Sequence, residues 1–223
     1  MFNEKVSKDP DNADPVYFHV YNRGVDKRDI FLNKADYYRF LHDLYEFNDR
    51  HPTNVNNRRI VGSPTSNNSN KIKLVDIICY CLMPNHYHLL VSVSDPASLT
   101  SFMRKLGTGY TNYFNQKYKH SGHLFQGKYK KILVESESQL LQLSKYIHLN
   151  PLKSSKAKTG NLEQYKYSSY LDYVGIKNMP SIISSNFLSS MFENKERYKD
   201  FVEEVEEKED SQLLDVRHPT ILN

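Results

Sequence analysis

The segment His86-Tyr87-His88 brings two imidazole side chains into one short stretch of the chain. It opens a β-rich run, and successive side chains of a strand point to opposite faces of the sheet. His86 and His88 therefore share a face, while Tyr87 and Leu89 point to the other. Two neutral imidazoles side by side can hold a divalent metal ion if one or two further ligands complete the site. A lone histidine pair on a strand is more often a hydrogen-bonded structural pair, so the motif needs support from elsewhere.

Tyr146 is a second candidate for chemistry, because Asn150 follows it by one helical turn. Residues four apart share a face of a helix, and Leu143 and Ile147 mark the buried stripe of this one. Tyr146 is expected at the edge of the core, with its hydroxyl close to the amide oxygen of Asn150. Taken separately, each residue has an ordinary structural explanation. The tyrosine would be a packing residue, and the asparagine, which precedes Pro151, would mark the end of a helix.

The two cysteines, Cys79 and Cys81, offer an alternative metal site together with His86 and His88. Their spacing, C-x-C-x4-H-x-H, does not match the patterns of structural zinc sites. In a hairpin the cysteines are expected to face the core and the histidines a cleft, which also disfavours zinc. Two cysteines so close along a strand do not form a disulfide framework, and this favours a cytoplasmic location.

Charge is unevenly distributed along the 223 residues. Residues 101–160 hold eleven basic residues against two acidic ones, a net charge of +9, whereas residues 193–217 carry −5. Tyrosines are interleaved with the basic block, and a groove for single-stranded nucleic acid requires both cations and flat rings. A tyrosine-filled core under a face of solvated lysines gives the same composition. No apolar run approaches the ~18 residues of a membrane span, so no membrane partner is expected.

The elements that would position these residues follow from hydrophobic periodicity and turn signals. Strands are expected over residues 16–22, 73–82, 86–93 and 128–134. Helices are expected over residues 34–48, after the cap Asp95, and from a capping box of Ser136 and Gln139 to about residue 150, where Pro151 stops the chain from continuing as a helix. The order β-α-β-β-α-β predicts an α+β, ferredoxin-like sandwich, an antiparallel sheet with helices over one face.

Two regions are expected from the changes in composition. Residues 1–175 form one domain with a long loop over residues 51–70, which is rich in Asn, Ser and Pro. Residues 176–223 form an acidic, helical C-terminal extension.

Five motifs occur in a single order between Val16 and Gly175. They are Y-F-H-V-Y-N-R-G, M-P-N-H-Y-H-L-L-V, G-H-L-F-Q-G-K-Y-K, Y-I-H-L-N-P and Y-K-Y-S-S-Y-L-D-Y-V-G. This set resembles the IS200-like single-tyrosine transposases of small insertion sequences, and among them most of all the REP-associated tyrosine transposases. The resemblance implies a metal-dependent enzyme that cleaves and rejoins single-stranded DNA, in transposition or in the mobilisation of repeats.

The resemblance also implies roles for individual residues. His86 and His88 occupy the His-hydrophobic-His metal motif of HUH nucleases, and Asn150 matches the third ligand to Mg²⁺ or Mn²⁺. Tyr146 matches the catalytic tyrosine, which keeps the 5′ phosphate in a phosphotyrosine link. Four basic residues are further candidates for contacts with the DNA backbone. Ordinary solvated charge at a strand edge would explain their presence equally well. These residues are Arg23, Lys128, Lys130 and Lys131.

The partner that the resemblance implies is single-stranded DNA, as hairpin or repeat ends. Relatives include monomers and dimers, so a homodimer is one expectation. The alternative is that the chain is catalytically silent and acts as a single-stranded DNA-binding protein or as a regulatory protein. Loss of a motif histidine or of the tyrosine would mark such a protein. All three are present here, which favours the enzyme.

Overall fold

The computed structural model describes residues 14–52, 71–177, 179 and 181–204. Most of the predicted loop 51–70 and the end of the predicted extension therefore lie outside the described residues. The strands are β1 (Val16–Arg23), β2 (Asp76–Met83), β3 (His86–Val93) and β4 (Lys130–Val134). The α-helices are α1 (Lys34–Glu46), α2 (Pro96–Tyr118), α3 (Glu137–Lys153), α4 (Tyr170–Tyr173), α5 (Asn186–Ser189) and α6 (Lys195–Glu203). Short 3-10 turns are η1 (Val25–Lys27), η2 (Ser155–Ala157) and η3 (Leu162–Gln164).

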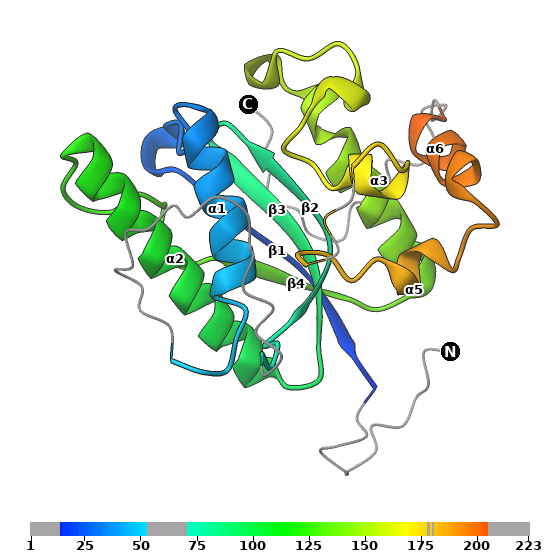
Figure 1. The fold of residues 1–223 in the computed structure, drawn as a ribbon, viewed down its shortest axis with the longest axis horizontal. Coiled ribbons are helices and arrows are strands. Elements are labelled where there is room, and N and C mark those ends of the chain that lie inside the picture. The colour runs from blue at the N-terminus through cyan, green and yellow to red at the C-terminus, as the bar shows by residue number, and fades with distance from the viewer. Residues whose placement is uncertain (1–13, 53–70, 178, 180, 205–223) are drawn as a thin grey trace.

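The strands form one four-stranded antiparallel sheet in the order β2-β3-β1-β4 (Figure 1). β1 lies between its partners, with Arg23 opposite His86 of β3 and Tyr21 opposite Lys130 of β4. A turn at Pro84 and Asn85 joins β2 to β3, as the hairpin motif predicts. This strand order and the β-α-β-β-α-β sequence are those of a ferredoxin-like sandwich, so the predicted α+β fold is confirmed.

Helices cover both faces of the sheet (Figure 1). On one face, the ring of Phe40 in α1 contacts Tyr110 of α2, with centroids 4.9 Å apart, and Tyr87 of β3, at 5.1 Å. The expectation of helices over one face holds for these two helices. On the other face, α3 packs against β2 and β3, and its Tyr146 meets His88. The face that carries the two histidines is therefore covered by the helix that carries the tyrosine.

Side chains cap α2 and α3 at the positions that the sequence predicts. The Asp95 carboxylate accepts a hydrogen bond from the Ala97 amide at 2.9 Å, and the Ser136 hydroxyl accepts one from Gln139 at 3.2 Å. The expectation that α3 stops before Pro151 is wrong, because the helix continues to Lys153. A proline lacks one N–H donor, and so close to the end of a helix this removes a single hydrogen bond. β2 begins three residues later than expected, and β4 begins two residues later.

The segment after α4 returns to the core through α6. Tyr198 and Val202 of α6 are fully buried, and the Tyr198 hydroxyl lies 2.7 Å from Nδ1 of His148 in α3. The Tyr170 hydroxyl donates to the Glu203 carboxylate at 2.6 Å. α6 is therefore packed against α3. Within the described ranges, no helix combines the length and apolar character needed to span a bilayer.

Candidate active site

Two histidines stand at the start of β3, beside the end of β1. Alternation along β3 places His86 and His88 on the face under α3, while Tyr87 points to the face under α1 and α2. Their ring centroids are 5.0 Å apart, with the ring planes at 89°. The structure thus gives the paired imidazoles that the sequence predicts.

α3 brings Tyr146 and Asn150 to the same place. The Tyr146 ring lies edge-on to His88, with centroids 5.6 Å apart and an interplanar angle of 84°. The Asn150 side chain donates from Nδ2 to the Tyr146 carbonyl oxygen at 2.9 Å, and it also hydrogen-bonds to His86. The four side chains that the sequence singles out are therefore gathered from two elements into one cluster.

The surroundings of His86 favour its neutral form. Burial lowers the pKa of His86 to about 4. The positive charges of Arg23 and Lys156 act in the same direction, and the hydrogen bond between His86 and Asn150 opposes them. Nδ1 lies 2.7 Å from the Asn85 amide oxygen, which can only accept a hydrogen bond. This contact places the proton on Nδ1 and the lone pair on Nε2. An oriented, neutral imidazole is the form that binds a metal ion.

His88 has a partner that the sequence reasoning missed. Its Nδ1 lies 2.8 Å from Nε2 of His19, and the two rings are stacked with centroids 5.1 Å apart. Both histidines are buried. His19 could have been found, because alternation along β1 places it on the same face as Tyr21, which is opposite His88 in the register.

The hydroxyl of Tyr146 is held in its protonated form. Burial raises the pKa of Tyr146, and the Asn150 hydrogen bond opposes this effect only in part. The Nζ atom of Lys153 lies 5.5 Å from the centroid of the Tyr146 ring. A reaction at this oxygen therefore depends on activation of the group that it attacks.

The four basic residues suggested for DNA contacts are not all at the cluster. Arg23 is opposite His86, and Lys130 is opposite Tyr21, so both lie on the face under α3. Lys131 points to the opposite face, where its Nζ lies 5.0 Å from the Phe18 ring centroid. Lys128 is exposed in the segment that precedes β4.

The expectation that the cysteines and histidines face apart is wrong. Cys81 is directly opposite His88 in the antiparallel register, and directly paired residues share a face. Cys79, two residues before, shares that face as well. Burial raises the pKa of both thiols, which keeps them protonated and makes them poor zinc ligands. Across the part of the chain that the structure describes, no group of three or more His, Cys, Asp or Glu could hold a metal ion. A metal site here needs the amide of Asn150.

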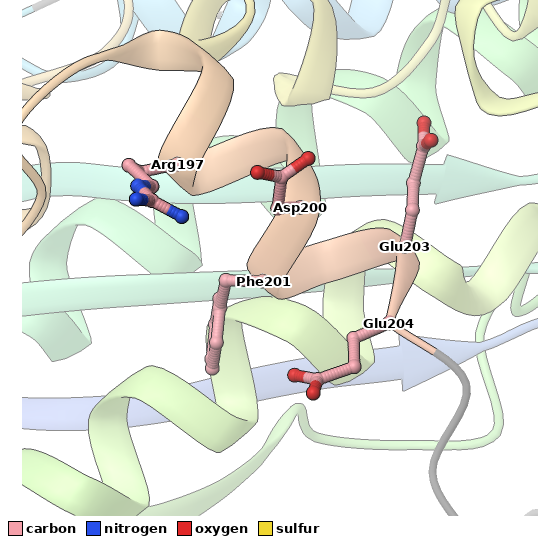
Figure 2. A pocket seen from close by; sticks show the side chains of 5 residues that line it. All are labelled: Arg197, Asp200, Phe201, Glu203 and Glu204. Carbon is pink, nitrogen blue, oxygen red and sulfur yellow. The ribbon is translucent and has the colours of Figure 1, made fainter.

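A surface pocket lies apart from this cluster, over α6 (Figure 2). None of the four clustered residues lines it. Its lining carries three carboxylates and one guanidinium, a charge balance that disfavours a phosphate ligand. The lining residues are Arg197, Asp200, Phe201, Glu203 and Glu204.

Comparison with known proteins agrees with the motifs. Residues 62–150 match the family model described as "Transposase IS200 like", a range that includes the two histidines, the tyrosine and the asparagine. No curated protein matches the chain.

Among the solved structures that resemble the chain are two described as transposases. One, described as a REP-associated tyrosine transposase bound to a REP hairpin, covers 76% of this chain and 85% of its own, with 13% identity and a TM-score of 0.48. The other, assigned as a transposase from Deinococcus radiodurans R1, covers 63% and 95%, with 16% identity and a TM-score of 0.39.

Proposed function

We propose that this chain, whose residues 62–150 match the IS200-like transposase family, cleaves and rejoins single-stranded DNA with Tyr146 as the nucleophile. One observation carries the proposal. The imidazoles of His86 and His88 and the amide of Asn150 meet the tyrosine ring in a single cluster on one face of the sheet. A hydrogen-bonded structural pair of histidines would not require a tyrosine and an amide beside it.

The donor atoms of this cluster fit a divalent metal ion. His86 and His88 each offer an imidazole nitrogen, and Asn150 offers an amide oxygen. Such a mixed set suits Mn²⁺ and accepts Mg²⁺. The lowered pKa of His86 supports the assignment, because the neutral imidazole is present at neutral pH. Either ion, when bound, would polarise the scissile phosphate and offset the charge that develops there.

Tyr146 would exchange one phosphodiester bond for another. Its hydroxyl oxygen attacks the phosphorus, the bond from phosphorus to the 3′ oxygen breaks, and the proton lost by the phenol is regained by the leaving oxygen. The products are a 5′ phosphotyrosine and a free 3′ hydroxyl. Since the covalent link keeps the energy of the broken bond, a waiting 3′ hydroxyl can reverse the step without ATP.

Charge supports a nucleic-acid substrate at this place. Residues 101–160 carry a net charge of +9 and include the whole of β4 and α3. Arg23 and Lys130 add positive charge on the face that holds Tyr146. Phosphate contacts by Lys and Arg supply most of the sequence-independent affinity for nucleic acid. Hairpin or repeat ends of single-stranded DNA are therefore the substrates to test.

Covalent capture of a labelled single-stranded oligonucleotide tests the proposal. The full-length chain should form a denaturation-resistant adduct with Mg²⁺ or Mn²⁺ and lose it in EDTA. Tyr146→Phe should abolish the adduct and keep binding nearly intact. Tyr129→Phe, a half-buried tyrosine in the same basic block, is the matched control and should keep both.

Two results would reject the proposal. An adduct that survives in Tyr146→Phe would assign the nucleophile elsewhere. Binding by the wild-type chain without any adduct, over a range of hairpin substrates and both ions, would support the catalytically silent alternative.

A further inference from the structure

A stack of aromatic rings begins in the core and ends at the surface beside β2. Phe31 and Tyr37 are stacked with centroids 4.4 Å apart and an interplanar angle of 19°. Tyr37 stacks in turn on Tyr167, at 3.7 Å and 9°. Phe31 and Tyr37 are buried, whereas Tyr167 is only half-buried. The outer end of the stack is therefore a flat ring that reaches the solvent.

Tyr38 of α1 extends this surface. Its ring meets Tyr167 edge-on, with centroids 6.3 Å apart and an interplanar angle of 77°. Tyr38 is 55% exposed, and among the described residues only Phe187 is another exposed phenylalanine or tyrosine. An exposed ring of this size contributes little to the core and remains accessible to a ligand.

Positive charge accompanies the rings. Lys34 lies one helical turn before Tyr38 on α1, and Lys166 directly precedes Tyr167; both lysines are exposed. Exposed aromatic rings next to cations are the two components that bind single-stranded nucleic acid without reading its sequence.

The rings lie on the side of α1, at the β2 edge of the sheet, and close along the backbone to the strand ends that carry the proposed cleavage site. The Tyr167 carbonyl oxygen accepts a hydrogen bond from the Leu82 amide at 3.0 Å, and Met83, the next residue, is opposite His86. The backbones of Tyr167 and His86 are thus about two strand spacings, ~10 Å, apart.

Lys156 of η2 forms an ion pair with Asp29, which precedes α1. Nζ of Lys156 is 2.5 Å from the Asp29 carboxylate. The carboxylate of Asp29 is therefore paired with a cation.

We propose that Tyr38 and Tyr167 form a stacking platform for the bases of single-stranded DNA that flank the scissile phosphate. The platform rests on the proposed function, since it deepens the description of the same substrate. A base that stacks on the side of the Tyr167 ring away from Tyr37 would continue the series of rings from the core, and Tyr38 would border it. Because every base has a flat face, this contact would hold the strand without selecting its sequence.

Binding of extended oligonucleotides tests the platform in the Tyr146→Phe background, which prevents cleavage. The oligonucleotides carry one to three extra nucleotides on the 5′ or the 3′ side, with 2-aminopurine at each added position in turn. Extension on one side should tighten binding, and the fluorescence of one position should be quenched. Tyr38→Ala should weaken binding of the extended strand roughly 10-fold and remove the quenching. Tyr38→Phe, which keeps the ring, should retain both.

Two controls separate stacking from other effects. Ile176→Ala removes an equally exposed apolar side chain from another part of the surface and should change nothing. Replacement of the quenched base by an abasic nucleotide should lower the affinity of the chain with Tyr38 intact as much as Tyr38→Ala lowers its affinity for the complete strand. The two losses of affinity should not add, because both changes remove the same contact.

Three outcomes would overturn the platform. The first is equal affinity of Tyr38→Ala and Tyr38→Phe for every extended strand. The second is additive losses from Tyr38→Ala and the abasic nucleotide. The third is a change of oligomeric state in Tyr38→Ala with unchanged DNA affinity, which would make the rings a contact between protein chains. Covalent capture of the unextended oligonucleotide by the chain with Tyr146 intact is read separately, so that failure of the cleavage proposal is distinguished from failure of the platform.

Discussion

The ring of Tyr146 stands edge-on to the ring of His88, with centroids 5.6 Å apart, although the two residues belong to different elements. Nδ1 of His88 lies 2.8 Å from Nε2 of His19. Within α3, the Asn150 side chain donates a hydrogen bond to the carbonyl oxygen of Tyr146. Each half of the proposed site is therefore held by a contact of its own. The packing of α3 on β2 and β3 then determines the distance between the halves.

The metal proposal predicts separate effects on activity and on stability. His86→Ala removes one proposed ligand from a partly exposed position. It should abolish cleavage and weaken Mn²⁺ binding at least 10-fold, while the free energy of unfolding changes by about 1 kcal/mol or less. Electron paramagnetic resonance of added Mn²⁺ and urea unfolding measure the two quantities. His123→Ala, an exposed histidine outside the cluster, should leave both unchanged. Full activity of the wild-type chain in chelator would exclude the metal mechanism.

The opposite directions of two neighbouring lysines provide a test of the DNA path. Lys130 lies on the face of Tyr146, whereas Lys131 points to the other face, near Phe18. Binding of single-stranded DNA should weaken with salt by ~0.7 log units per log unit of salt for each phosphate neutralised. Lys130→Glu should lower that slope, and Lys131→Glu should change it less. A larger effect from Lys131, or a flat slope in wild type, would place the DNA path on another surface.

Local sequence patterns predict each half of the candidate site. Strand alternation is enough to place His86 and His88 on one face, and the helical spacing of four is enough to pair Tyr146 with Asn150. Both patterns depend only on neighbours along the chain, so they survive in any fold that keeps the strand and the helix.

Relations between distant segments could not be predicted in this way. The error about the cysteines arose because the register of β2 against β3 decides which face Cys81 shares with His88. The helical pattern of α3 likewise does not say which face of the sheet the helix covers. Tyr198 is a third example, because its contact with His148 joins segments that no periodicity connects.

The contact between α6 and α3 predicts a stability effect for the extension. His148 is fully buried with a pKa lowered by burial to about 3, so it is neutral, and its ring nitrogens contact the hydroxyls of Tyr198 and Ser169 at 2.7 and 2.9 Å. Tyr198→Phe leaves one ring nitrogen without this partner and should cost about 1–3 kcal/mol. Tyr198→Ala also leaves a cavity and should cost about 3–5 kcal/mol. Urea unfolding measures both changes.

The half-buried Tyr129 supplies the control for this comparison, since Tyr129→Phe should change the free energy of unfolding by less than about 0.5 kcal/mol. Equal stability of wild type and Tyr198→Ala would show that α6 does not contribute to the fold.

The environment of Asp36 implies a specific dependence of the free energy of unfolding on pH. Its fully buried carboxylate accepts hydrogen bonds from Lys117 at 2.6 Å, from Tyr118 at 2.7 Å and from Tyr113 at 2.9 Å. Burial alone would raise the pKa of Asp36, but these contacts, above all the one with Lys117, hold it below its usual value. The contribution to stability is therefore complete above pH ~4, the ordinary value for Asp, and is lost as pH falls through the lower folded pKa.

Asp36→Asn should thus destabilise the chain by about 3 kcal/mol at pH 7, because Lys117 loses its partner. The difference from wild type should stay constant from pH 7 to pH 5 and shrink at pH 3, as urea unfolding at the three pH values would reveal. A difference that grows toward low pH would have the wrong sign for this account.

The site of covalent attachment tests the central claim most directly. The wild-type chain is allowed to react with a single-stranded hairpin oligonucleotide in Mn²⁺, the complex is digested with protease and nuclease, and the modified peptide is sequenced by mass spectrometry. The account predicts a nucleotide joined through its 5′ phosphate to Tyr146, and no such peptide in EDTA. Attachment to Tyr110 or Tyr129, or a 3′ phosphate link, would contradict it.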